Sequence, residues 1–367
     1  MTTMTAIVDL QFGSTGKGLI AGYLSQRKAF DTVVSANMPN AGHTFVDSNG
    51  IAWVNKVLPS GLYGASTTYV GLGPGAIFDP LQLAQEIDGM RSAMKGIPSD
   101  PTIIIHECAA LLHEDHRIAE KKLNPIASTM QGSSEAMVQK IRRDVIGSNI
   151  CGQSLEYLDK IITSRGEKLS KFVVSNQQWM DIMLASDNIL VEGSQGYSLG
   201  INAGFYPYCT SRDCTIHRLI ADCGIPVLNN KTIIGTARVH PIRVGNTEGG
   251  HSGSVYPDQL EISWASIGVA PELTTVTKRV RRVFTFSEAQ IYEALMMNGP
   301  DYVFMNFCNY DVAEAIRVSN VINKIGREVH SRRGLGNALI LDDYPPLVRY
   351  MGFGPRAEDV MEVNHYY

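Results

Sequence analysis

Short runs of apolar and β-branched residues recur along the chain, and stretches with helical spacing separate them. The runs that we predict as strands cover residues 5–12, 32–37, 67–73, 102–107, 188–196, 232–239 and 301–307. The stretches that we predict as helices cover residues 17–28, 80–95, 134–146, 154–164 and 312–325. Because parallel neighbours need a crossover connection, this alternation predicts an α/β fold with a mostly parallel central sheet flanked by helices. Ligands are then expected at the carboxyl ends of the strands.

The composition shows no boundary between domains. We find no Pro-, Gly- or Ser-rich linker, no internal repeat and no low-complexity tract. Residues 1–367 are therefore predicted to form a single large domain. Hydrophobic residues make up 44% and charged residues 19% of the chain, a composition that supports a sizeable core and argues against disorder.

Charge and cysteine content argue against several classes of protein. The formal net charge of -4 argues against a protein that binds polymeric nucleic acid, because such proteins usually carry a basic surface. The six cysteines form no C-x-x-C pair, which argues against a zinc knuckle and favours a reduced, intracellular protein. We find no signal peptide and no run of roughly 18 apolar residues, so we predict a cytoplasmic protein without membrane contact.

The stretch "DLQFGSTGKGLI", residues 9–20, has the composition of a phosphate-binding loop. Its glycines let backbone N–H groups point at an anion, the following helix adds positive potential, and Lys17 adds a charge. It differs from a Walker A loop, because Gln11 occupies the leading glycine position and Gly18 replaces the hydroxyl that holds magnesium. Taken alone, the loop fits a phosphate site or a strand-to-helix turn equally well.

Further motifs follow this loop in a fixed order. Together with the loop they resemble those of the adenylosuccinate synthetase family, from residue 5 to about residue 356. The motifs are "NAGHT" (40–44), "EGSQG" (192–196), "YPYCTS" (206–211), "RVG" (243–245), "TVTKRVRR" (275–282) and "GFGP" (352–355).

The resemblance implies an adenylosuccinate-synthetase-like fold, related to the P-loop NTPases, and a ligase activity. Enzymes of this family use a nucleoside triphosphate to phosphorylate the 6-oxygen of a purine nucleotide, and aspartate then displaces the phosphate. A lactam oxygen is a poor leaving group, and phosphorylation makes it a good one. The negative charge gathered in such a site implies Mg²⁺ as cofactor.

Ser14 departs from the common family pattern, which has an aspartate that removes the purine N1 proton and helps to hold magnesium. The loop "GSTGKG" (13–18) resembles that of the family's phage branch, which makes 2-amino-2'-deoxyadenylosuccinate from dGMP and aspartate. Guanine carries a 2-amino group beside N1, and a serine leaves room for that amine and can accept a hydrogen bond from it. The resemblance thus implies dGMP, L-aspartate and ATP or dATP as substrates, and the cytoplasm of a host cell if the chain is phage-encoded.

The resemblance also assigns site residues position by position. The implied catalytic residues are Ser14, Lys17, His43 and Gln195. The substrate nucleotide is expected at Ser14, Asn40, Thr129, Arg143, Gln195 and Thr210, and aspartate at Thr275, Thr277, Arg279 and Arg281. The phosphate donor is expected at Gly13, Thr15, Gly16, Lys17, Gly18, Gly42, His43, Thr44, Asn309, Asp311, Gly354 and Pro355, and the metal at Ser14 and Gly42.

The residue types suit these roles. Histidine can donate a hydrogen bond near neutral pH, and the planar fork of arginine fits a carboxylate. Asn309 replaces the family lysine beside the donor base, which argues against GTP specificity and favours ATP or dATP, although the sequence does not decide among ATP, dATP and GTP. The family arginine matched by Arg143 reaches across a dimer interface, which implies a homodimer, although Arg142 fits that position as well.

Three alternatives remain open from the sequence. The chain could be an adenylosuccinate synthetase that acts on IMP, a purine-nucleotide-binding protein without catalysis, or a phosphotransferase. The basic segment 275–282 favours a second, dicarboxylic substrate and speaks against the last two. The sequence does not identify the group that accepts the N1 proton, or the contact that distinguishes deoxyribose from ribose.

Overall fold

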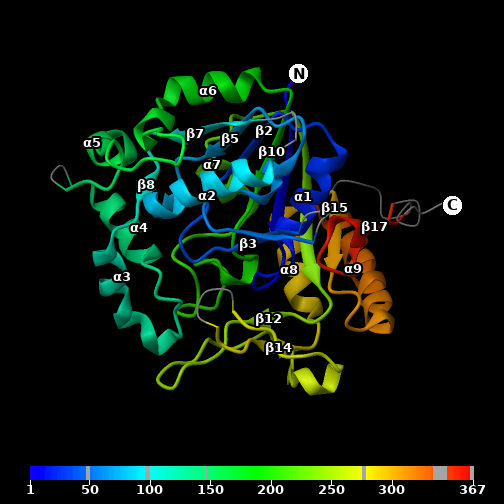
Figure 1. Cartoon of the computed structure of the whole chain (residues 1–367). Coiled ribbons are helices and arrows are strands. Elements are labelled where there is room, and N and C mark those ends of the chain that lie inside the picture. The colour runs from blue at the N-terminus through cyan, green and yellow to red at the C-terminus, as the bar shows by residue number, and fades with distance from the viewer. Residues whose placement is uncertain (47–49, 96–99, 145–146, 275–277, 334–344, 364–367) are drawn as a thin grey trace.

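A computed structural model gives the fold of the chain (Figure 1). It describes all residues except 47–49, 96–99, 145–146, 275–277, 334–344 and 364–367. The α-helices are α1 (Lys17–Arg27), α2 (Pro80–Ala93), α3 (Glu114–Glu120), α4 (Ser133–Arg142), α5 (Leu155–Leu158), α6 (Asn176–Ala185), α7 (Ile216–Asp222), α8 (Glu288–Asn298) and α9 (Val312–Arg332). No helix in this part of the chain is long and apolar enough to span a bilayer.

A ten-stranded sheet runs through the middle of the molecule in the order β17-β16-β15-β11-β1-β10-β2-β5-β7-β9. All neighbours pair in parallel except β16 and β17, which are antiparallel. This arrangement confirms the predicted fold class. The strands are β1 (Thr3–Asp9), β2 (Thr32–Ser35), β5 (Tyr69–Leu72), β7 (Thr102–His106), β9 (Val173–Val174), β10 (Asn188–Glu192), β11 (Asn230–Arg238), β15 (Tyr302–Asn306), β16 (Val348–Gly352) and β17 (Val360–Glu362).

Three smaller sheets lie outside the large one. The first is an antiparallel pair of strands, the second is a short parallel pair, and the third has three strands in the order β12-β14-β13. Their strands are β3 (His43–Val46) with β4 (Ala52–Asn55), β6 (Ile77–Phe78) with β8 (Ala110–Leu111), and β12 (Ile242–Arg243), β13 (Glu261–Ile262) and β14 (Arg282–Phe284).

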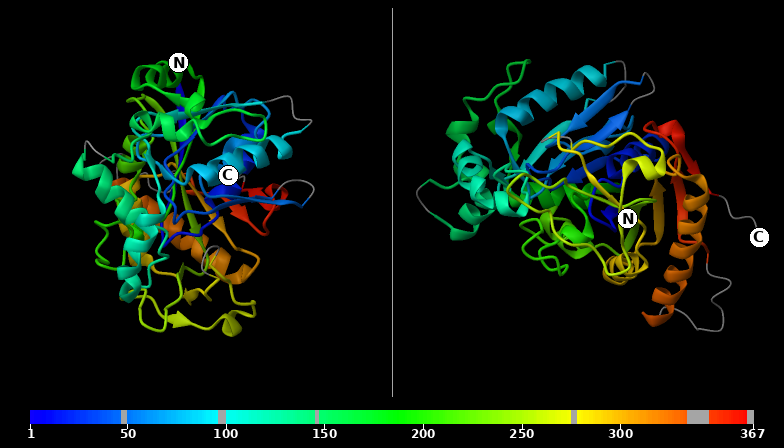
Figure 2. Two further views of the ribbon diagram at one scale, coloured as in Figure 1. Left: turned by 60° about the vertical axis from the view of Figure 1, so that its left-hand side comes forward. Right: turned by 90° about the horizontal axis from the view of Figure 1, so that it is seen from below.

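Two apolar cores lie on opposite faces of the large sheet, and helices cover both faces (Figure 2). The alternation along β1 shows how the sequence builds them, because Ile7 packs with α1 and α2 while Ala6 and Val8 pack with α6 to α9. A strand that is apolar on both faces is typical of a buried parallel sheet.

Polar residues end the central strands at one edge of the sheet. Asp9, Ser35, Glu192, Arg238 and Asn306 are the last residues of β1, β2, β10, β11 and β15, and all five are buried. Because parallel strands share one direction, these side chains gather at the same edge, where the sequence predicted ligands. Buried polar groups of this kind need partners, and the partners form the site described below.

The structure corrects some predicted elements. The helix predicted over 154–164 is only the single turn α5, because Ile162 instead pairs with Lys168 in a short antiparallel bridge. The helices α6 and α8 and the strand β16 were not predicted. Helix α8 did carry a signal, since Ser287 caps its start and Gly299 follows its end. The predicted single domain of 1–367 stays a prediction.

Helix α1 packs closely on the hairpin that carries His43. Gly22 of α1 faces the ring of Phe45 in β3, and a Cβ on Gly22 would lie 2.1 Å from a ring carbon. Phe45 is buried and stacks on Tyr63, with 5.2 Å between ring centres. The ring therefore has little room to move aside.

We expect Gly22→Ala to lower the free energy of unfolding by about 1–3 kcal/mol, because the methyl group overpacks this contact. Urea unfolding followed by circular dichroism measures the change. Gly89→Ala in α2 is the matched control: a Cβ there meets nothing within 4 Å, so helix propensity should stabilise it by up to about 1 kcal/mol. Equal effects of the two substitutions would contradict the packing argument.

Candidate functional site

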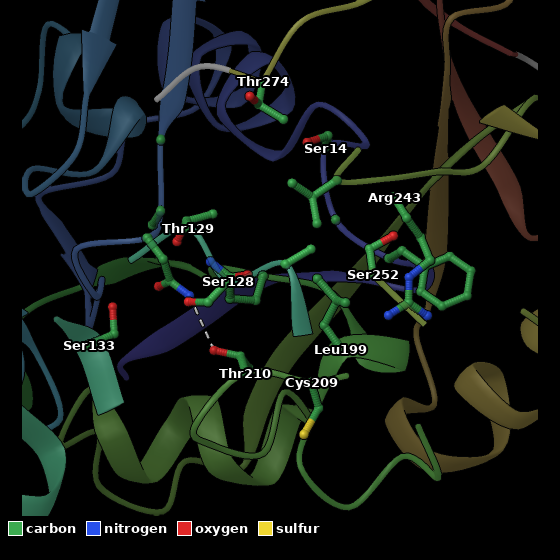
Figure 3. A pocket seen from close by; sticks show the side chains of 18 of the residues that line it. Ser14, Ser128, Thr129, Ser133, Leu199, Cys209, Thr210, Arg243, Ser252 and Thr274 are labelled. Atoms are coloured by element: carbon green, nitrogen blue, oxygen red, sulfur yellow. Dashed lines mark hydrogen bonds between the residues drawn. The ribbon is translucent and has the colours of Figure 1, made fainter. Parts of the chain in front are cut away.

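A cavity of about 550 Å³ opens at the edge of the sheet where these polar residues gather. Figure 3 shows Ser14, Thr129 and Thr210 around the same opening. The cavity is lined by many of the residues that the sequence predicted: Gly13, Ser14, Gly16, Lys17, Gly18, Asn40, Gly42, His43, Thr44, Thr129, Gln195, Thr210 and Arg281.

The loop between β1 and α1 has the backbone shape of an anion-binding nest. Gly13, Ser14 and Gly16 take left-handed conformations, with φ of 91°, 56° and 92°. Gly16 is also sterically required, since a Cβ there would lie 2.1 Å from Nδ2 of Asn306. The loop thus turns its backbone toward the cavity at the start of a helix.

The buried carboxylate of Asp9 holds this loop in place. It accepts hydrogen bonds from the N–H of Gln11 at 2.9 Å and the hydroxyl of Thr15 at 2.5 Å. Lys17 Nζ lies 2.8 Å from Asp9 Oδ2 and also donates to the carbonyl of Gln195 at 2.8 Å. Asp9 therefore fixes the position of the Lys17 ammonium group. The backbone N–H groups of the nest remain as the donors that this loop offers to an anion.

His43 is oriented by a second buried carboxylate. Its Nδ1 shares a hydrogen bond with Oε1 of Glu192, and both side chains are buried. The other carboxylate oxygen accepts the N–H groups of Ser60 at 2.6 Å and Gly61 at 3.3 Å. With Nδ1 engaged in this way, His43 has Nε2 left for a ligand.

Arg281 reaches Ser14 across the cavity wall. Its Nη1 donates to Ser14 Oγ at 2.5 Å, and burial lowers the pKa of its guanidinium. The Ser14 backbone carbonyl accepts a bond from Arg238, which also pairs with Glu272. Burial alone would raise the pKa of Glu272, but Arg238 holds that pKa below its ordinary value.

Another part of the wall combines an amide–hydroxyl pair with a fixed loop. Asn40 Nδ2 donates to Thr210 Oγ1 at 3.2 Å, the bond drawn in Figure 3. Arg279 donates from Nη2 to the carbonyls of Ala127 at 3.1 Å and Ser128 at 3.2 Å. Arg279 thus supports the loop just before Thr129, and it does not line the cavity itself.

Comparison with known proteins identifies the family. A family model described as adenylosuccinate synthetase matches residues 6–153 and 153–331. The chain belongs to the adenylosuccinate synthetase family. The resemblance seen in the motifs is thereby confirmed.

Two phage proteins are similar to the chain along nearly its whole length. N6-succino-2-amino-2'-deoxyadenylate synthase of Vibrio phage phiVC8 is 43% identical over 362 residues, 98% of this chain and 98% of that protein. The cyanophage S-2L succinoaminodeoxyadenylate synthetase, solved with dGMP and with dATP as an energy donor, superposes with a TM-score of 0.83. It is 36% identical and covers 99% of this chain and 95% of its own.

A more distant structure shares the fold alone. Adenylosuccinate synthetase from Plasmodium falciparum superposes with a TM-score of 0.70 at 18% identity. The match covers 98% of this chain and 99% of that one.

Some residues that the family resemblance singled out lie outside the cavity lining. Thr15 is buried beneath the loop, Arg143 is exposed at the end of α4, and Asp311 caps α9 by accepting the N–H of Glu314 at 2.9 Å. Thr275 and Thr277 lie outside the described residues. The predicted residues that do not line the cavity are Thr15, Arg143, Arg279, Asn309, Asp311, Gly354 and Pro355.

Several functional-site residues were not assigned a role from the sequence. Glu192 stands in the "EGSQG" motif and Arg243 in "RVG", so a signal was present for both. Arg243 donates to the carbonyls of Ser254 at 2.7 Å and Tyr208 at 2.8 Å, and burial lowers its pKa to about 10. Its guanidinium carbon lies 4.6 Å from the centre of the Phe12 ring. It therefore joins three segments of the cavity wall.

The metal predicted at Ser14 and Gly42 would receive few ligands from the chain. Within the described residues, no three His, Cys, Asp or Glu side chains are placed to share a metal. The cavity offers the Ser14 hydroxyl, already bonded to Arg281, and the Gly42 backbone. This donor set fits Mg²⁺ held mainly by substrate phosphates and water, which is how that ion commonly binds.

The Arg238–Glu272 pair predicts a pH effect on stability. Because the folded pKa of Glu272 lies below its ordinary value of 4.5, the pair stabilises the fold fully above that pH. The contribution is lost as the pH falls through the folded pKa. The gap in unfolding free energy between wild type and Glu272→Gln should therefore narrow between about pH 6 and about pH 3.5. Urea unfolding at both pH values tests this, and a constant gap would contradict it.

Proposed function

We propose that this protein joins L-aspartate to the 6-position of dGMP at the expense of ATP or dATP. The names of its phage relatives and the dGMP and dATP bound by the cyanophage synthetase support the proposal. The observation in this chain that carries it is Ser14, which lies in the cavity's nest where the common family pattern has an aspartate. The product is 2-amino-2'-deoxy-N6-succinyladenylate.

The reaction has two steps. In the first, guanine O6 attacks the γ-phosphorus of the donor, the O6–P bond forms, and the bond to the nucleoside diphosphate breaks as N1 loses its proton. In the second, the aspartate amine attacks C6, the C6–N bond forms, and phosphate leaves with the former O6. The amine gives up a proton, and N1 carries none in the product.

The chain's own groups suit these steps. The nest at Gly13 to Gly16 offers backbone donors for the donor phosphates, and Lys17 adds positive charge beside them. His43, fixed by Glu192, presents Nε2 to the 6-oxygen or to the phosphoryl group in transfer. Arg281 offers a guanidinium fork for an aspartate carboxylate at the side of Ser14.

Ser14 provides the purine specificity in this proposal. Its hydroxyl is smaller than a carboxylate and leaves space for the 2-amino group of guanine. Arg281 donates to one lone pair of Oγ, and a second lone pair remains to accept from that amine. Gln195, in a left-handed conformation with φ of 63°, lines the same cavity as a further contact for the base.

Magnesium would be held by the Gly42 carbonyl together with the phosphates, because Arg281 and the 2-amino group take both lone pairs of the Ser14 hydroxyl in this assignment. When bound, it supplies charge neutralisation for the phosphoryl group in transfer. The donor base is assigned to the side of Phe307, which lines the cavity and leads to Asn309 and Asp311.

The homodimer implied by the family remains a proposal as well. Arg143 is exposed at the end of α4, beside a surface with three large exposed apolar side chains. These are Ile118 of α3 and Val138 and Ile141 of α4, of which Ile141 is 65% exposed. A second copy of the chain that covers this surface would bring Arg143 to the partner's nucleotide.

In the presence of Mg²⁺, ATP or dATP, and aspartate, we expect the wild type to convert dGMP and not IMP. Mass spectrometry of the product measures the conversion. Ser14→Asp should lower kcat/KM for dGMP at least about tenfold, because the larger side chain crowds the 2-amino group. Ser14→Ala keeps the space and should lose less. Turnover of IMP alone, or unchanged dGMP turnover by Ser14→Asp, would refute the substrate assignment.

Glu192→Gln should lower kcat about 100-fold, because an amide has only one acceptor oxygen for the backbone N–H groups of Ser60 and Gly61 and for His43 Nδ1, so its NH₂ group would face one of these partners. Binding of dGMP, measured by calorimetry, should change little. Glu86→Gln is the matched control, since Glu86 is also a buried carboxylate and accepts the N–H groups of Lys56, Val57 and Leu58 outside the cavity. A similar loss of kcat in both variants would mean that Glu192 acts through stability alone.

A further inference from the structure

We propose that Arg238 is a positioning residue that holds the Ser14 loop and the Arg281 segment in one fixed arrangement. This inference rests on the proposed function in one respect, which is the assignment of aspartate to the Arg281 side of the cavity. Arg238 carries no assigned role in the family motifs used above. Its position at the end of β11 places it under the cavity.

The Arg238 side chain is completely buried and contacts three segments. Its Nη1 donates to the Ser14 carbonyl at 3.2 Å, and its two Nη atoms lie 3.3 and 2.5 Å from the carboxylate oxygens of Glu272. Its guanidinium carbon lies 3.9 Å from the centre of the Phe307 ring. One planar group thus joins the loop after β1, the segment after residue 271 and the loop after β15.

The backbone of Arg238 is fixed to the same loop. Its N–H donates to Oε1 of Gln11 at 2.9 Å, and Nε2 of Gln11 donates back to its carbonyl at 3.2 Å. Gln11 is fully buried. The end of β11 therefore cannot shift relative to the Ser14 loop without breaking two buried hydrogen bonds.

The contacts close into a ring. Glu272 accepts the Arg281 N–H on its backbone carbonyl at 2.9 Å, and Arg281 Nε donates to the Leu273 carbonyl at 3.2 Å. From there Arg281 reaches Ser14 Oγ, and Arg238 reaches the Ser14 carbonyl. Ser14 is thus held on both its backbone and its side chain by arginines that Glu272 connects.

A neighbouring tyrosine fixes the carboxylate in this ring. The Tyr310 hydroxyl donates to Glu272 Oε1 at 3.0 Å, and burial raises the pKa of that hydroxyl to about 12. Glu272 is therefore held from two sides and cannot release Arg238 by a simple rotation. The distance between Ser14 and Arg281 follows from this geometry, and with it the relative position of purine and aspartate.

Arg238→Lys is the decisive variant, because lysine keeps the charge but cannot bond Ser14 and Glu272 in the arginine geometry. We expect the KM for aspartate to rise about tenfold and kcat to fall about tenfold. The affinity for dGMP without aspartate, measured by calorimetry, should change less than about threefold. Arg349→Lys is the matched control, since its ion pair with Glu362 lies at the sheet edge away from the cavity, and it should change neither constant.

A second pair of variants separates positioning from folding. Arg238→Met removes the ion-pair partner of the half-buried Glu272, leaves its carboxylate with the Tyr310 hydroxyl, and should lower the melting temperature. The double variant Arg238→Met with Glu272→Leu removes both charges and should recover much of that temperature, while the KM for aspartate stays raised. Recovery of the KM together with stability would overturn the proposal, and so would an Arg238→Lys variant within twofold of wild type in both constants.

The identity of the purine substrate is tested separately from the role of Arg238. The wild type is first assayed with dGMP and with IMP, and the variants are compared with the purine that it converts. Failure with dGMP would sink the proposed substrate and leave the Arg238 comparison in place. Calorimetric titration of aspartate onto nucleotide-loaded protein gives the same comparison without turnover.

Discussion

Burial of charged side chains at the carboxyl edge of the sheet is the constraint on which the site depends. A charge taken out of water is costly unless a partner of opposite charge or several hydrogen bonds receive it. The pairs Asp9–Lys17 and Arg238–Glu272 meet this requirement, and Glu192 meets it with His43 and two backbone N–H groups. The Asp9–Lys17 pair closes the first loop on itself, whereas Arg238–Glu272 and His43–Glu192 join segments that are far apart in the sequence.

This pairing also explains why the cavity is preorganised. Groups that remain for ligands include the backbone nest of the first loop, the second nitrogen of His43, and the part of the Arg281 guanidinium that Ser14 and Leu273 do not occupy. Groups fixed in this way need no reorganisation when charge develops during phosphoryl transfer. The strained backbone at Ser14 is retained because Arg238 and Arg281 hold it from two sides.

Much of the fold could be predicted from local pattern. The central strands β1, β10, β11 and β15 carry runs of apolar residues, many of them β-branched in the first three, with apolar side chains on both faces, and that signal is strong. The prediction of a helix over 154–164 was wrong because the bridge between Ile162 and Lys168 competes with helical hydrogen bonds. The proposed role of Arg143 needs a second copy of the chain, and no property of one sequence places that copy.

The sequence by itself determined which chemical groups are available: a glycine-rich loop with a serine in place of an acid, a histidine, and a cluster of arginines in a fixed order. Only the tertiary structure decided how they are used. It assigned Arg279 to support of the 127–128 loop and Arg281 to Ser14, although the two stand in the same basic run. It also revealed Arg238, which looks like an ordinary strand end in the sequence. The physical reason is that burial and pairing are properties of segments brought together in space, and residue spacing along one chain does not contain them.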